Sequence, residues 1–264
     1  MIDMGVRRFG RVNWLGMTML AWREILRFTS VWQQTLLAPL ITAGLFLTVF
    51  ALAFGQNRAD VMGVPYLAFL APGILMMTVI QNAFANTSSS ILIAKVQGNI
   101  VDTLMPPLSP LETLLGYLAG SVTRALAVAA IIALGIGVTI GQWPAHPLWL
   151  MLIVVMGAVL MGGLGIAAAI WANKFDQMAA ITNFIVTPLS FLSGTFYSAE
   201  ALPRVFYALT HFNPVFYLID GARYGMLGMS DANPAQGLAV VALFAGGVSA
   251  LCWTWLKSGY RMKP

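Results

Sequence analysis

Residues 95–112, with the sequence KVQGNIVDTLMPPLSPLE, interrupt a chain of long apolar runs and decide how the rest of it is arranged. Read as a helix, the segment has a polar side covering an arc of roughly 100° and an apolar side opposite. Prolines at 106, 107 and 110 end that helix, since each lacks a backbone N–H. The polar side carries Lys95, Asn99, Asp102 and Thr103, and the apolar side carries Val96, Ile100, Val101, Leu104 and Met105.

A helix of about ten residues cannot cross a hydrocarbon core about 30 Å thick. We therefore expect residues 95–105 to lie at a membrane surface and to offer their polar face to a soluble partner. From spacing alone, a surface loop without a partner is an equal alternative.

The composition assigns the chain to the membrane. Of its 264 residues 59% are hydrophobic and 9% charged, and the mean hydropathy is +0.82, which is not found in soluble domains of this size. The net charge of +5 does not indicate a nucleic-acid partner, because the basic residues flank apolar runs. The single cysteine, Cys252, excludes an internal disulfide and lies in an apolar run, as a packed thiol would. We predict an all-α polytopic membrane protein.

Six apolar segments are predicted to span the bilayer. The third would be about 45 Å long as one helix, longer than the bilayer is thick, and Arg124 falls about one turn inside its boundary. Arg124 is either a functional intramembrane charge or a residue that snorkels or pairs structurally, and we favour the second interpretation. The predicted spans cover residues 35–54, 66–85, 111–140, 148–172, 178–197 and 237–256.

Two further segments are predicted to lie at the membrane without crossing it. Residues 11–30 resemble an interfacial helix with Trp22 on its apolar face and arginines near anionic lipid on the other. Residues 202–227 hold two apolar stretches that are each too short to span and are separated by Asn213-Pro214. We expect them to form a re-entrant helix pair packed against protein, with one kinked seventh span as the alternative.

The basic residues indicate the orientation. Six spans place both termini on one side, together with ten of the fourteen Lys and Arg residues. The other side holds Arg58, Arg204 and Arg223, and Arg124 is left in the membrane. By the positive-inside rule, the termini and residues 95–105 are cytoplasmic and residues 202–227 are external.

The sequence lacks the motifs of several catalytic sites. None of the four lysines follows a glycine, so a phosphate-binding Gly-Lys-Ser/Thr loop is absent. Phe191 stands where an intramembrane serine protease needs a glycine before Ser193. The histidines, His146 and His211, have no acidic partner at a ligand or relay spacing. We expect no catalytic site and no metal site.

The order of segments resembles the permease subunits of type 2 ABC exporters. The likeness rests on the basic N-terminal helix, six spans, the amphipathic segment with its LxxPLSP, and the external stretches SGTFYSAEALP and NPVFYLIDGARYG. It covers essentially the whole chain and is strongest to the YadH-type group, with NodJ and O-antigen export permeases as more distant relatives.

The resemblance implies a subunit that dimerises, binds a separately encoded ATPase and exports an amphipathic molecule (lipid, glycolipid, polysaccharide or drug) across a bacterial inner membrane. ATP and Mg²⁺ would be bound by the ATPase, and this chain would bind no cofactor. The segment 95–105 would be the coupling helix, docking through Lys95, Val96, Asn99, Ile100, Asp102, Thr103 and Leu104, and the first and fifth spans would face the second copy.

Aromatic residues near the external end have two interpretations. Phe191, Phe196, Tyr197, Phe212 and Phe216 would form an apolar gate or, alternatively, the aromatic belt common to membrane proteins. A secondary transporter is disfavoured, because no Asp or Glu falls in the membrane-embedded part of a predicted span. A membrane scaffold remains an alternative, and the sequence does not specify the substrate.

Overall fold

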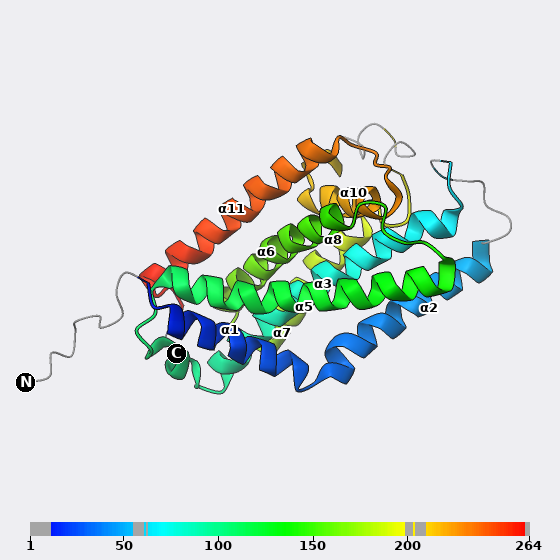
Figure 1. Ribbon diagram of the computed structural model, residues 1–264. Helices are drawn as coiled ribbons and strands as arrows, with labels where there is room; N and C mark the ends of the chain where they lie inside the picture. Colours follow the sequence, from blue (N-terminus) through cyan, green and yellow to red (C-terminus); the bar gives the residue numbers. More distant parts are fainter. Residues whose placement is uncertain (1–11, 55–60, 62, 199–202, 204–209, 262–264) are drawn as a thin grey trace, which may run out of the picture.

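The computed structural model describes residues 12–54, 61, 63–198, 203 and 210–261, and these form helices joined by short turns (Figure 1). Within these ranges the only extended pairing is an isolated bridge between Val61 and Val64. The prediction of an all-α membrane protein is confirmed by five described helices that are long and apolar enough to cross a bilayer. They are Gln33–Ala53, Tyr66–Val96, Pro110–Ile140, Pro147–Trp171 and Pro234–Ser258.

Local sequence signals set the ends of these helices. Helix α5 (Pro110–Ile140) starts with a capping box, in which the Ser109 side chain accepts from the backbone N–H of Glu112 and the Glu112 carboxylate accepts from that of Ser109. Helix α11 (Pro234–Ser258) starts with Asn233 as the cap and Pro234 in its first turn. Glycines in the left-handed conformation end α5 and α11, because glycine adopts it without steric cost.

Helix α3 (Tyr66–Val96) lies at the centre and is mostly buried. It packs mainly against α6 (Pro147–Trp171) and α5, and also against α10 (Pro214–Leu227) and α2 (Ala38–Phe54). The α3 and α6 backbones approach closely because Gly165 has no side chain: a Cβ there would stand 2.5 Å from the carbonyl oxygen of Phe84. In contrast, α2 buries little of its surface against the rest of the chain.

The bundle has two distinct ends. At one end lie α1 (Trp14–Thr29), the short α4 (Ile100–Leu104) and the last turn of α11, whose neighbour Arg261 donates to the carbonyl oxygen of Trp171 (Figure 1). We call it the α4 end. At the opposite end, the α10 end, the Tyr66 hydroxyl donates to the carbonyl oxygen of Phe196. The first and last described residues both lie at the α4 end (Figure 1).

The predicted span 178–197 is a helix of three consecutive pieces: α7 (Phe175–Ile181), the π-helical turn η2 (Thr182–Val186) and α8 (Thr187–Phe191). Its 17 residues rise about 26 Å, at the lower limit for crossing a bilayer. It ends six residues before the predicted boundary, in a turn where Gly194 has a φ of 80°. Because Ala172 lies at the α4 end and Phe196 at the α10 end, these pieces connect the two ends of the bundle.

The surface segments also differ from their predicted bounds. Helix α3 continues to Val96, eleven residues past the predicted end of the second span, and α4 has only five residues instead of the eleven predicted for 95–105. Of residues 202–227, the structure describes Pro203, the three helical residues before Asn213, Asn213 itself and α10, and residues 202 and 204–209 lie outside the described residues. Helix α10 begins beside Ser193 and ends beside His146, so both of its ends lie at the α10 end.

Candidate functional site

The predicted coupling segment lies at the α4 end, in the turn that joins α3 to α5. Its helical parts are the last two residues of α3, Lys95 and Val96, and the short α4, in which Ile100 and Thr103 face the protein with exposed fractions of 2% and 6%. A helix of five residues can bury only one narrow face, and Ile100 and Thr103, three residues apart, lie on that face. Of the predicted apolar side, only Ile100 is therefore buried against the protein. We define the α4 patch as six of the exposed residues around α4, those predicted on the two faces of the segment: Val96, Asn99, Val101, Asp102, Leu104 and Met105; Gln97, Gly98, Pro106 and Pro107 are exposed beside it.

Lys95 lies outside the α4 patch. Its ammonium donates hydrogen bonds to the carbonyl oxygens of Ala169, Ile170 and Ala172 over 3.1, 2.8 and 2.7 Å. These carbonyls at the end of α6 lack partners within the helix, and the negative end of the helix dipole attracts a cation. Lys95 thus caps α6 and fastens the end of α3 to it.

Helix α1 holds α4 in place. The Arg23 guanidinium donates to the hydroxyl oxygens of Thr103 and Tyr117 over 3.0 and 3.3 Å. Arg23 also pairs with Glu24, whose side chain is fully buried and accepts from Ser90 on α3 over 2.8 Å. One ionic cluster therefore joins α1, α3, α4 and α5.

The orientation of α1 corrects one prediction. Its apolar residues, including Trp14 and Met19, are exposed to the surroundings, as an interfacial helix requires. Its arginines bind protein groups instead of facing lipid: Arg27 donates to Ser89 and to the backbone and side-chain oxygens of Asn86. The sequence did not indicate this, because the acceptors are more than 55 residues away.

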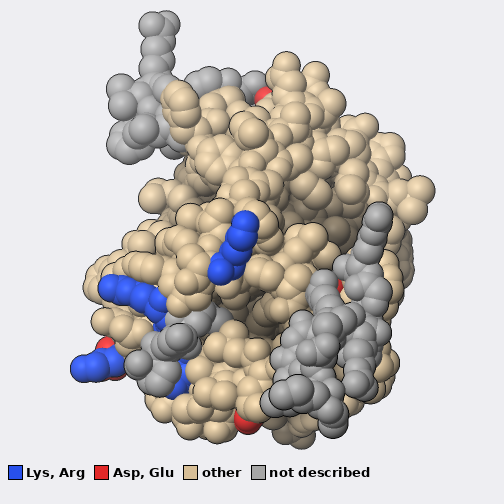
Figure 2. All heavy atoms as spheres, turned by 90° about the vertical axis from the view of Figure 1, so that its left-hand side faces the viewer, with Lys and Arg blue, Asp and Glu red and all other residues tan. Residues whose placement is uncertain are grey.

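Figure 2 looks onto the α4 end and shows Lys and Arg side chains gathered there with few acidic ones. The described basic residues of these segments belong to α1, the last turn of α3, the α6–α7 turn, and the last turn of α11 with the residues after it. They include Arg23, Lys95, Lys174, Lys257 and Arg261.

The predicted aromatic gate is divided in the structure. Phe196 stacks on Phe191 and on Phe50 with ring centroids 5.5 and 5.2 Å apart, joining α8 to the end of α2. Phe50 was not predicted, because no local signal separates it from other apolar residues of its span. The Tyr197 hydroxyl donates to the carbonyl oxygen of Leu192 close by. Phe212 is 80% exposed and Phe216 is 1% exposed, so they do not join this stack.

A buried ionic lock lies under α10. Arg223 is fully buried and donates to the carbonyl oxygen of Gly194 over 2.8 Å, and it pairs with Asp220 and Asp231. Its guanidinium lies 4.0 Å from the centre of the Phe69 ring on α3. Burial raises the pKa of the Asp220 carboxyl, and backbone N–H groups of Asp231 and Ala232 oppose that shift. The lock joins α10 to α3 and to the turn after α8.

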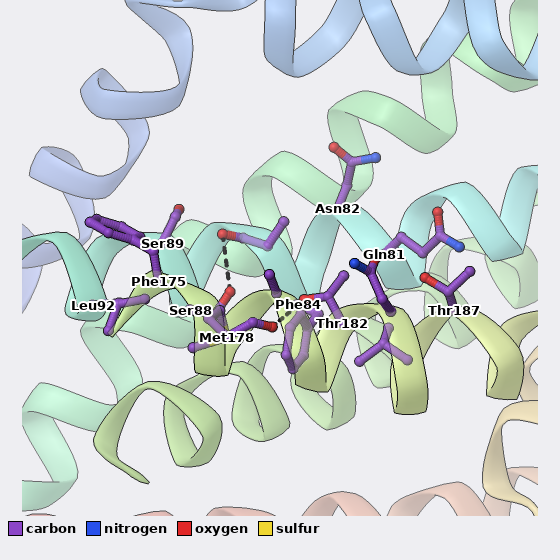
Figure 3. A pocket seen from close by; sticks show the side chains of 14 residues that line it. Gln81, Asn82, Phe84, Ser88, Ser89, Leu92, Phe175, Met178, Thr182 and Thr187 are labelled. Carbon is purple, nitrogen blue, oxygen red and sulfur yellow. Dashed lines mark hydrogen bonds between the residues drawn. The ribbon is translucent and has the colours of Figure 1, made fainter. Parts of the chain in front are cut away.

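A groove of about 500 Å³ separates α3 from α7, η2 and α8 (Figure 3). Its walls combine apolar side chains such as Phe84 and Met178 with amides and hydroxyls, and no charged residue lines it. The polar groups come from both walls, which run side by side in Figure 3. They are Gln81, Asn82, Ser88, Ser89, Thr182, Asn183 and Thr187.

Arg124 lies behind this groove. Its guanidinium donates to Oδ1 of Asn82 over 2.6 Å, and its exposed fraction is only 8%. The buried Nε has no hydrogen-bond partner, and no described carboxylate lies within ion-pair distance. Arg124 is therefore held inside the protein by a neutral amide and does not reach the bundle surface as a snorkelling side chain would.

Similarity to known proteins covers nearly the whole chain. The family model described as ABC-2 type transporter matches residues 16–227. The inner membrane transport permease YadH of Escherichia coli strain K12 is 35% identical over 95% of this chain and 98% of its own length. Nodulation protein J of Sinorhizobium fredii strain NGR234 is 25% identical over 88% of each chain, and that of Rhizobium leguminosarum bv. viciae is 26% identical over 89% of this chain and 90% of its own.

Proposed function

The chain belongs to the ABC-2 type transporter family, and from this we propose that it is the transmembrane subunit of an exporter driven by a separate ATPase. Members of this family are transport permeases and not enzymes in their own right. ATP and Mg²⁺ are bound by the partner subunit in this proposal. The cargo is an amphipathic molecule that leaves across the bacterial inner membrane.

The observation that carries the proposal is the α4 patch. Four of its six residues, Val96, Val101, Leu104 and Met105, are apolar and 45% to 76% exposed at the end of the bundle where basic residues gather. A patch that mixes exposed apolar side chains with the charged Asp102 is typical of a protein-binding surface. The α4 patch is the surface on which the ATPase docks.

Movement of the docked ATPase is transmitted through fixed contacts. Arg23 connects α4 to α1, and Lys95 connects the end of α3 to α6. Because these contacts are hydrogen-bonded and partly buried, a displacement of α4 moves the ends of α1, α3 and α6 together. This linkage supports α4 as the coupling helix.

We also propose six crossings with both termini in the cytoplasm. The pieces α7, η2 and α8 supply the sixth crossing, because they connect the two ends of the bundle. The basic α4 end is cytoplasmic under the positive-inside rule. Helix α10 then lies on the external side as a helix that does not cross.

A second copy of the chain completes the transporter in this proposal. Helix α2 exposes Leu45, Val49 and Leu52, and the η2 segment exposes Phe184 at 81%. Lipid can cover such faces, but a pathway for an amphipathic molecule needs walls on all sides. Two copies that meet through α2 and α7–η2–α8 enclose the groove shown in Figure 3.

Purification of the complex from its native membrane in mild detergent tests the function. We expect an ABC-type ATPase to copurify and its ATP hydrolysis to change when this chain is removed. Recovery of the chain without any ATPase, under conditions in which transport is retained, would overturn the proposal.

A further inference from the structure

We propose that the groove between α3 and α7–η2–α8 binds the anionic headgroup of an amphiphile, with Arg124 and Arg27 supplying the attracting charge. This inference rests on the proposed export function and specifies the chemistry of the cargo.

The first observation is an imbalance of charge next to the groove. Arg23 and Arg27 both pair with Glu24, whereas Arg124 has no carboxylate partner among the described residues. Among these three guanidinium groups, the one carboxylate in ion-pair contact is that of Glu24, which leaves an excess of two positive charges. A buried charge without a counter-ion is costly, so it is retained where a ligand supplies the opposite charge.

The second observation is that groove residues connect directly to both arginines. Asn82 and Ser89 line the groove seven residues apart, and so lie on one face of α3. The Asn82 oxygen accepts from Arg124 over 2.6 Å, and the Ser89 hydroxyl accepts from Arg27 over 3.2 Å. In Figure 3, Asn82 points away from α7–η2–α8, in keeping with its bond to α5. An anion on this wall is therefore one side chain away from each guanidinium, and low polarity strengthens the attraction over that distance.

The third observation is the mixed lining. Thr187 on one wall and Gln81 on the other supply neutral hydrogen-bond donors for a headgroup, whereas the hydroxyls of Thr182 and Ser88 donate within their own helices. Phe84, Met178 and other apolar side chains provide contacts for a hydrocarbon chain. An amphiphile matches this lining better than a small inorganic anion, because the anion has no hydrocarbon part to contact the apolar wall.

Binding of short-chain lipids to the purified full-length chain in a non-ionic detergent tests the proposal. The headgroup of dioctanoyl phosphatidylglycerol has a net negative charge. Dioctanoyl phosphatidylcholine has acyl chains of the same length and a headgroup with no net charge. We expect phosphatidylglycerol to bind at least tenfold more tightly to the wild-type chain. Equal affinities for the two lipids would overturn the proposal. Binding of inorganic phosphate as tight as that of phosphatidylglycerol would also overturn it, because the hydrocarbon chains would then contribute nothing.

Substitutions of Arg124 test whether this side chain causes the preference for the anionic lipid. Arg124→Gln should lower the affinity for phosphatidylglycerol about tenfold and leave that for phosphatidylcholine unchanged, whereas Arg124→Lys should keep most of the preference. Arg261→Gln, which removes the same charge at the α4 end, serves as the matched control and should bind like wild type. An unchanged lipid preference in Arg124→Gln would overturn the assignment.

Thermal unfolding without lipid separates ligand binding from a structural role. Removal of an unpaired buried charge should leave the melting temperature of Arg124→Gln equal to or above that of wild type. A clear drop would mean that the bond between Arg124 and Asn82 holds α5 to α3, and the ligand role would be rejected. None of these measurements needs the ATPase, so their failure is distinct from a failure of the proposed export function.

Discussion

The guanidinium of Arg23 donates a hydrogen bond to the hydroxyl oxygen of Thr103 over 3.0 Å and so fastens α1 to α4 across 80 residues of sequence. Thr103 was expected to face a soluble partner, but it is buried and occupied within the chain. Any force on α4 therefore acts on α1 as well.

Thr103→Val tests this link. It keeps the shape of the side chain and removes the hydroxyl acceptor, so we expect the chain to lose about 1 kcal/mol of stability, a reduced value because Arg23 is half exposed. A double-mutant cycle with Arg23→Gln in thermal unfolding measures the coupling. Strictly additive effects of the two changes would show that the bond contributes nothing.

Asp102→Arg tests the docking surface. Asp102 is exposed, so reversal of its charge should leave folding and membrane insertion intact while it abolishes transport and weakens ATPase binding. Transport assays and copurification of the ATPase check both effects. Asp176→Arg is the control, since it places the same exposed charge on α7 outside the α4 patch. Full transport by Asp102→Arg would refute the coupling role of α4.

Lys95→Met separates capping from docking. Loss of the ammonium leaves three carbonyl oxygens at the end of α6 without their donor, so we expect destabilisation of about 1–3 kcal/mol. Thermal unfolding of the purified chain provides the measurement. ATPase affinity should stay within a few-fold of wild type. A variant with wild-type stability and strongly weakened ATPase binding would place Lys95 back among the docking residues.

Gly165→Ala tests the close contact between α3 and α6. The added methyl group would stand 2.5 Å from the Phe84 carbonyl oxygen and 2.3 Å from the Thr87 hydroxyl, so we expect a loss of about 1–3 kcal/mol. Gly246→Ala on α11 is the matched control: nothing lies within 4 Å of its new Cβ, and helix propensity should raise stability by up to about 1 kcal/mol. Similar melting temperatures for both variants would contradict the packing described here.

Single cysteines test the sixth crossing. Cys252→Ala provides a background without thiols, in which Asn173→Cys and Ser230→Cys report on the two ends of the bundle. With an impermeant maleimide on intact cells, we expect labelling at 230 and protection at 173. The same accessibility at both positions would contradict this topology, because either α7, η2 and α8 do not cross the membrane or α10 crosses it as well.

The sequence was most informative where the signal is local. Apolar runs predicted α5, α6 and α11 within a few residues. The structure places Ser-Pro, His-Pro and Asn-Pro at their starts, because caps and breakers act on their immediate neighbours. The end of the predicted span 178–197 lies six residues past the end of α8, because the turn at Gly194 falls in an apolar stretch. Hydropathy alone does not distinguish such a turn from a membrane helix.

Long-range partners could not be predicted from a single sequence. Lys95 has the pattern of a solvent-facing residue, but the end of α6 attracts its ammonium. Glu24 sits in a basic helix and is buried, because Ser90 and two arginines satisfy its carboxylate. Arg124 was expected to reach the headgroups or to pair structurally, and only the fold shows that its partner is a neutral amide.

Helix α3 is one continuous helix between the two ends of the bundle, with Pro72 in its interior. Its 31 residues rise about 46 Å, from Tyr66, which holds Phe196, to Lys95, which holds α6. A tilt of about 5° around its midpoint would shift each end by about 2 Å in opposite directions, by the geometry of a rod of that length. In the proposed exporter, the close contact of α3 with α6 at Gly165 would oppose sliding, so that a push at one end of α3 would become an opposite swing at the other, with no signal passed through the lipid.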